Sequence, residues 1–307
     1  MRVIQRVCSK TSSRLVNDNY TFFKYGAAYQ LFAAVFALVT AFAVGFYGVN
    51  APTIVCSAIS AILFGIDIFC GIEAIKGCSL VVANTFANGG LIISVAASYI
   101  WFGEDVSAFQ IAGLVVFFVS VYLLSVTKKE EKDKKITPKT LVLLIIDLIA
   151  NGAVMVVQKY FALKVEGGNT AVFSLFTFLL CAVIMAVCAF VVRLRPTDPA
   201  LSAPEQSENP QPDKKPFLCA KLVVCAAALA LALFAINYLV TEMGHYVDSV
   251  VLFPVSSAIS VLITALVGAI AYKEKPNAFG IAGIVLGLVS IILLSVFTPS
   301  VVCAIFG

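Results

Sequence analysis

The stretch Ala108–Val126 reads AFQIAGLVVFFVSVYLLSV, and Ala278–Val296 repeats it as AFGIAGIVLGLVSIILLSV. The two stretches align without a gap at a displacement of 170 residues, and 12 of their 19 positions are identical. The same displacement pairs three further sets of residues: Asp67 with Asn237, Ser79 with Ser249, and Glu104 with Glu274. Apolar composition alone would not hold one register through two loops, so we infer that the chain contains two homologous halves.

Nine long apolar runs occupy most of the chain, of which 61% is hydrophobic and only 12% is charged. A soluble domain carries about 25% charged residues. A membrane-spanning helix needs about 20 mostly apolar residues, because its backbone polar groups must be satisfied within the segment. The predicted spans are Phe22–Tyr47, Thr53–Ile75, Leu80–Phe102, Phe109–Val126, Thr140–Leu163, Asn169–Val192, Phe217–Val240, Val250–Tyr272 and Phe279–Phe297. The pattern predicts an all-α integral membrane protein that crosses the membrane many times.

The start of the chain corresponds to the interior of a helix in the second half. VIQR at residues 3–6 resembles VVQK at residues 156–159, which lie near the end of a full span. We therefore expect a ten-helix plan in which only a remnant of the first helix is present. The predicted domains are a first repeat over 1–126, a charged linker over 127–139, a second repeat over 140–297 that includes a disordered polar loop over 193–216, and a tail over 298–307.

Lysine and arginine are concentrated in alternate connections between the spans. Connections after odd-numbered helices of the ten-helix plan carry clusters such as TKKEEKDKKITPK at 127–139, whereas those after even-numbered helices carry little beyond Lys164. The positive-inside rule places the charged connections in the cytoplasm. Because five helices per half is an odd number, the two halves are expected to lie in opposite orientations, which is typical of secondary transporters.

These features resemble the drug/metabolite transporter superfamily, in particular its ten-helix EamA-type members. The likeness rests on FGEDVSAFQIAGLVVFFVSVYLLSV, from Phe102, and YKEKPNAFGIAGIVLGLVSIILLSV, from Tyr272, in which an acidic residue and a short turn precede a glycine-bearing helix. The resemblance implies two inverted five-helix repeats around a central cavity that opens alternately to each side. It also implies a multi-pass protein of the cytoplasmic membrane whose partners are the lipid bilayer, a small solute and a coupling proton or counter-substrate.

Ionisable residues inside the spans are few, and a charge at the bilayer centre costs about 2.5 to 3.5 kcal/mol on insertion scales. Asp67 lies well inside its span, and Asn237 occupies the equivalent position of the other half. Asp147 and Asn151 lie one turn apart on one face of their helix. Two interpretations stay open: these groups bind a solute, cation or proton, or they form structural hydrogen bonds between helices. Lys159 lies nearer a span end, where we expect its ammonium group to reach the membrane interface.

Three further groups of polar residues are candidates for contact with a solute. Helices interrupted by Gly or Pro at corresponding positions of two halves point to a transport site, although small residues also permit close helix packing. Tyrosine near a span end is alternatively an interface anchor. The candidates are Asn84 and Asn88, which precede Gly89 and Gly90; Ser256 and Ser257, which follow Pro254; and Tyr29 and Gln30.

The sequence contains no phosphate-binding loop, nucleophile elbow or metal-ligand spacing. The nine cysteines form no C-x-x-C pair and are interpreted as packing residues, while the single histidine, His245, is interpreted as a loop or helix-end residue. Membrane topology accounts for the small basic excess without nucleic acid. We predict a non-enzymatic secondary transporter of a small metabolite or drug-like solute, with no cofactor or metal. The alternative is a non-transporting membrane protein, either a lipid-handling enzyme or an assembly partner.

Overall fold

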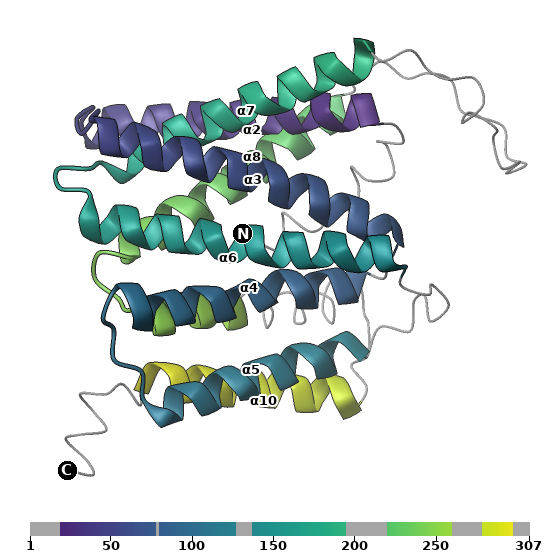
Figure 1. Cartoon of the computed structure of the whole chain (residues 1–307), viewed down its shortest axis with the longest axis vertical. Coiled ribbons are helices and arrows are strands. Elements are labelled where there is room, and N and C mark those ends of the chain that lie inside the picture. The colour runs from purple at the N-terminus through teal and green to yellow at the C-terminus, as the bar shows by residue number, and fades with distance from the viewer. Residues whose placement is uncertain (1–18, 78–79, 127–136, 195–219, 260–277, 297–307) are drawn as a thin grey trace, which may run out of the picture.

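The computed structural model describes residues 19–77, 80–126, 137–194, 220–259 and 278–296, and these residues are almost entirely helical (Figure 1). The helices are α2 Asn19–Val44, α3 Ala51–Gly77, α4 Leu80–Trp101, α5 Ala108–Val126, α6 Pro138–Lys164, α7 Thr170–Leu194, α8 Ala220–Met243 and α10 Ala278–Val296, with a further helical segment Ser249–Ile259 after α8. Eight of the nine predicted spans therefore coincide with a helix over most of their length, and of the ninth, Val250–Tyr272, the described part 250–259 is helical while the rest lies outside the described residues. Five helices in the described part of the chain have, on their own, the length and apolarity that a membrane crossing requires.

Several predictions concern residues outside this described part. They are the remnant of a first helix in residues 1–18, most of the charged linker in 127–136, the greater part of the polar loop in 195–219, and the tail in 297–307. The predicted loop starts slightly too early, because Arg193 and Leu194 still belong to α7.

Large apolar side chains cover the outside of the bundle, whereas its interior combines small side chains with large buried ones such as Phe117 and Phe161. In α2 the exposed side chains include Val39 and Phe42, which are 63% and 69% exposed, while Ala33 and Ala37 are fully buried. Exposing such an apolar surface to water is unfavourable, whereas lipid tails solvate it. Small residues on the inward faces allow the helix backbones to approach closely. The distribution is that of a helical membrane protein.

The helices form one bundle in which α2 packs against α7 and α5 packs against α10, while α6 lies between α3 and α4 (Figure 1). The α5–α10 contact is close because Gly113 of α5 faces Leu294 of α10. Near the other end of this contact the Ser120 hydroxyl donates a 2.7 Å hydrogen bond to the Gly283 carbonyl. Since Gly113 precedes Ser120 and Leu294 follows Gly283, the two helices run antiparallel.

The connections 45–50, 102–107, 165–169 and 244–248 all lie at one end of the bundle, on the left in Figure 1. We call this end the short-loop end. Two of its loops touch directly: the Asn169 amide donates to the Gly45 carbonyl at 2.8 Å, and a methyl group on Gly48 would lie only 2.6 Å from the Gly167 carbonyl oxygen. Gly48 also has a positive φ of 78°, which glycine adopts without strain.

Candidate functional site

Helix α6 is the central polar element of the bundle. Thr137 caps its start, with the Thr137 hydroxyl accepting from the Thr140 N–H, and Pro138 occupies the first turn, where its missing donor costs nothing. Further along, the buried residues Asp147, Gln158 and Lys159 project from the helix toward different neighbours. Each of these groups has a partner on another element, so α6 connects the two halves through polar contacts.

Asp147 faces α3, where it meets Asp67. The two carboxyl groups interact directly with each other, and a methyl group on Gly71 of α3 would lie 2.8 Å from the Asp147 Oδ1 atom. Asp67 is half-buried, while Asp147 is only 3% exposed. Within the described residues no basic side chain pairs with either carboxyl group. Two predicted site residues from helices about 80 positions apart thus form one acidic pair.

Tyr29 lies within electrostatic range of this acidic pair, since Asp67 of α3 and Cys181 of α7 both act on its hydroxyl. Tyr25 and Tyr29 are buried in an apolar cluster between α2, α7 and α8, with ring centroids 5.8 Å apart. The alternative interpretation of Tyr29 as an interface anchor is therefore wrong. The neighbouring Gln30 is fully buried, and its amide approaches the Tyr29 hydroxyl without reaching hydrogen-bond geometry.

Asn151 holds α6 against α4. Its side-chain amide donates to the Ala87 carbonyl at 3.2 Å. One residue on, the backbones of Gly152 and Gly90 touch, and a methyl group on Gly90 would lie 2.7 Å from the Gly152 nitrogen. Helix α4 runs without a break through Gly89 and Gly90, so these glycines act in close packing and do not interrupt the helix.

The remaining candidates for contact with a solute lie in α4 and in the helical segment after α8. Asn88 is buried in α4, and the side chain of Asn84 lies outside the described residues. Ser257 is buried and Ser256 is half-buried in the segment Ser249–Ile259, which is helical through Pro254.

Asn237 of α8 binds Gln158 of α6, which the repeat alone did not predict. The Gln158 Nε2 atom donates to the Asn237 Oδ1 atom at 2.8 Å, and the Asn237 Nδ2 atom donates to the Leu233 carbonyl at 2.8 Å. Asn237 therefore has an amide partner at the position where its repeat counterpart Asp67 has a carboxyl partner.

We expect Asn237→Leu to destabilise the protein by about 1 to 3 kcal/mol, because it leaves the buried Gln158 amide without an acceptor. Thermal unfolding in detergent measures the change. The double variant Gln158→Leu/Asn237→Leu removes both partners and should recover part of the loss. Strictly additive losses would show that the two amides do not interact.

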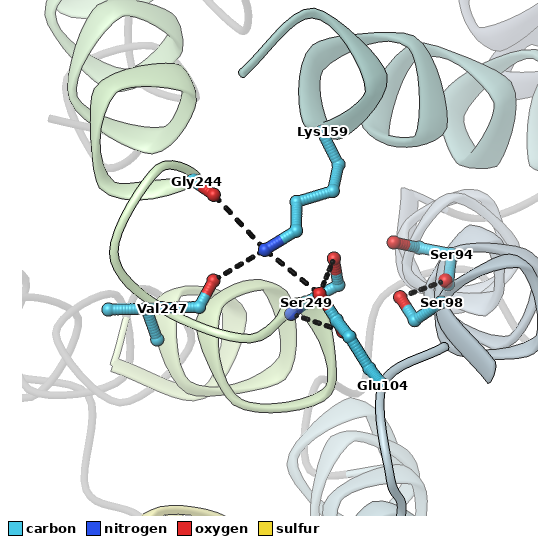
Figure 2. A network of polar contacts seen from close by, with 7 residues as sticks. All are labelled: Ser94, Ser98, Glu104, Lys159, Gly244, Val247 and Ser249. Atoms are coloured by element: carbon cyan, nitrogen blue, oxygen red, sulfur yellow. Dashed lines mark hydrogen bonds and ion pairs between the residues drawn. The ribbon is translucent and has the colours of Figure 1, made fainter. Parts of the chain in front are cut away.

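A buried ion pair at the short-loop end contradicts the prediction for Lys159. The Lys159 ammonium lies 2.9 Å from Glu104 Oε1 and donates to the carbonyls of Gly244, at 3.1 Å, and Val247, at 2.8 Å (Figure 2). The other carboxylate oxygen, Oε2, accepts a 2.8 Å hydrogen bond from the Ser249 N–H. Lys159 is 3% exposed, so its ammonium group is enclosed by protein and does not reach water as expected.

The repeat contained a signal for this pair. Glu104 corresponds to Glu274, Ser249 corresponds to Ser79, and Lys159 corresponds to Arg6, so each half carries an acid, a serine and a base at equivalent positions. Apolar packing does not require charges to recur in both halves. The recurrence therefore indicates a specific contact.

Two cavities open at the short-loop end and share His245 and Tyr246 in their walls. One, of about 380 Å³, lies between Tyr47, Tyr238 and Glu242. The other, of about 490 Å³, adjoins the ion pair and is also lined by Asp105 and Asp248. His245 is an exposed loop residue directly after α8, as predicted.

The family model for the EamA-like transporter family matches residues 138–296, which is more than half of the chain. The chain belongs to the EamA-like transporter family. A crystal structure named only "Crystal structure of protein" is similar to this EamA-like protein with a TM-score of 0.72 at 15% identity, over 97% of this chain and 94% of that one. No curated protein matches the sequence. The comparisons identify a helical membrane protein of a transporter family, for which a small solute is the expected substrate.

Proposed function

We propose that this EamA-like protein is a secondary active transporter of the cytoplasmic membrane, which carries a small metabolite or drug-like solute by alternating access. The observation that carries the proposal is the set of polar groups enclosed by an apolar bundle, namely Tyr29, Asp67, Asp147, Gln158 and Asn237. Burying such groups in lipid is costly, so they are expected where a protein binds a polar solute or ion.

Inverted repeats are the second part of the proposal, with residues 1–126 and 140–297 as the two units. Helices at corresponding positions run in opposite directions: α2 ends at the short-loop end and α7 begins there, and α5 and α10 pack antiparallel. The contacts between helices are symmetric as well. Helix α3 contacts α7, and the counterpart of α3 in the second half, α8, contacts the counterpart of α7 in the first half, α2. Two such halves can rock about a central site, which exposes the site to each side in turn.

The Asp67–Asp147 pair is the proposed coupling and binding site. A carboxyl group without a basic partner can accept a proton or the ammonium group of a solute, and either would relieve the repulsion between two adjacent carboxylates. Tyr29 lies within electrostatic range of the pair, and Gln30 and Asn151 are the proposed groups for hydrogen bonds to the solute. The proposed partners are thus a small solute and a coupling proton or counter-substrate.

Flux into proteoliposomes tests the transport proposal. The purified protein is offered amino acids, nucleosides, sugars and amphipathic cations, with and without an imposed pH gradient, and protein-free liposomes serve as the control. We expect saturable uptake of at least one class that responds to the gradient or to preloaded solute. Flat uptake of every class, together with a partner that co-purifies in fixed ratio, would favour the assembly-partner alternative.

A further inference from the structure

The Lys159 ammonium group has no donor left for a solute. A lysine side chain carries three N–H donors. The three donors meet three acceptors within 3.1 Å: Glu104 Oε1, the Gly244 carbonyl and the Val247 carbonyl. A solute in the adjoining 490 Å³ cavity would have to displace one of these partners to bind Lys159. The Lys159 ammonium group therefore joins structural elements of the bundle and does not form an open binding site for a solute.

The Lys159–Glu104 ion pair joins the two halves of the chain. Lys159 lies on α6 and binds the 244–248 loop, and α6 and this loop both belong to the second half. Glu104 lies in the α4–α5 connection, which belongs to the first half. Glu104 also binds the N–H of Ser249, the first residue of the helical segment Ser249–Ile259. One carboxylate thus holds both α6 and the start of that segment (Figure 2).

Glu104 is held in place independently of this contact. Gly103 turns the chain with a positive φ of 66°, and the Glu104 N–H folds back to donate to the Ser98 carbonyl at 3.1 Å. On the other side Ser107 and Gln110 form a capping box, in which each side chain accepts from the backbone N–H of the other. The carboxylate is therefore presented by a short connection that is fixed at both ends.

We propose that the Lys159–Glu104 pair is a latch that keeps the transport pathway closed at the short-loop end and breaks each time the pathway opens there. The inference rests on the proposed alternating-access function. A buried ion pair separates readily only where both ions regain water. The open cavity next to the pair, lined by the exposed carboxylates of Asp105 and Asp248, supplies a polar space for that hydration. Lys159 and Glu104 are positioning residues in this scheme and do not contact the solute.

Thiol accessibility tests the latch. Ser94 of α4 is 1% exposed and lies one turn deeper in the bundle than Ser98, beside the latch (Figure 2). Ser94→Cys is labelled with a membrane-impermeant maleimide from the face that carries the 244–248 loop, and the signal of the protein without this substitution is subtracted. We expect Lys159→Met to raise the labelling rate by at least about tenfold, because the open state is no longer opposed by the ion pair. Solute flux should fall at the same time, since resealing is impaired.

Lys164→Met is the matched control, because it makes the same change on the same helix at an exposed position five residues further on. It should leave labelling and flux unchanged. Glu104→Gln keeps an oxygen acceptor for the Ser249 N–H and removes only the charge, so it decides the question if Lys159→Met does not fold. Labelling at the parent rate in a folded, monodisperse latch variant overturns the inference. Raised labelling in a protein that moves no solute would support the closure and reject transport, which separates the two proposals.

Discussion

Replacing Asp67 or Asp147 by asparagine should lower solute flux by about tenfold to a hundredfold. Asparagine has the same shape but cannot ionise, so each variant loses the negative charge without a change of side-chain size, and residue 147 keeps its packing against Gly71. Hydrogen bonds to charged groups contribute about 1.5 to 3 kcal/mol, which corresponds to this range of rates. Initial uptake rates in proteoliposomes at matched protein density measure the effect.

The response to a pH gradient should disappear together with the flux if the acidic pair carries the coupling proton. In the part of the chain that the structure describes, the other titratable groups that interact electrostatically with Asp67 are Tyr29, Cys70 and Cys181, and none of these is basic. Glu166→Gln is the matched control, since it also replaces a carboxylate by the corresponding amide, at an exposed loop position. Wild-type flux in both span variants would remove the acidic pair from the proposed mechanism.

Gly90→Ala should destabilise the fold by about 2 to 3 kcal/mol, because the added methyl group would overlap the backbone of a neighbouring helix. The added carbon would lie 2.7 Å from the Gly152 nitrogen and 2.9 Å from the Leu148 carbonyl oxygen, both backbone atoms of α6 that cannot rotate away. Helices α4 and α6 would have to separate, which would also stretch the hydrogen bond from Asn151 to Ala87.

Gly65→Ala provides the comparison for this effect. Gly65 also lies within a span, but a methyl group there would meet the Ile184 and Met185 side chains at 3.7 Å and 4.0 Å, which are ordinary contacts. Because alanine favours helix more than glycine by about 1 kcal/mol, Gly65→Ala should be neutral or stabilising. Equal unfolding temperatures for the two variants would contradict the close α4–α6 contact.

Sequence reasoning identified Asp67, Asp147, Asn151 and Asn237 as unusual, because polar groups are rare in apolar runs of this length. It did not identify their partners. Asp67 and Asn237 hold equivalent places in the two repeats, yet one meets a carboxyl group and the other meets the Gln158 amide. The prediction for Lys159 was wrong for a related reason: its distance from the span end suggested a route to water, while a folded-back loop covers that route.

The spans, the duplication and the stripe of polar residues on α6 were determined by the sequence itself, since lipid imposes length and apolarity on every crossing segment separately. Only the tertiary structure decided which polar groups meet. Those contacts depend on how each helix is rotated and how closely small residues such as Gly90 and Gly152 let two backbones approach. Such geometry arises from packing between distant segments, and no single span encodes it.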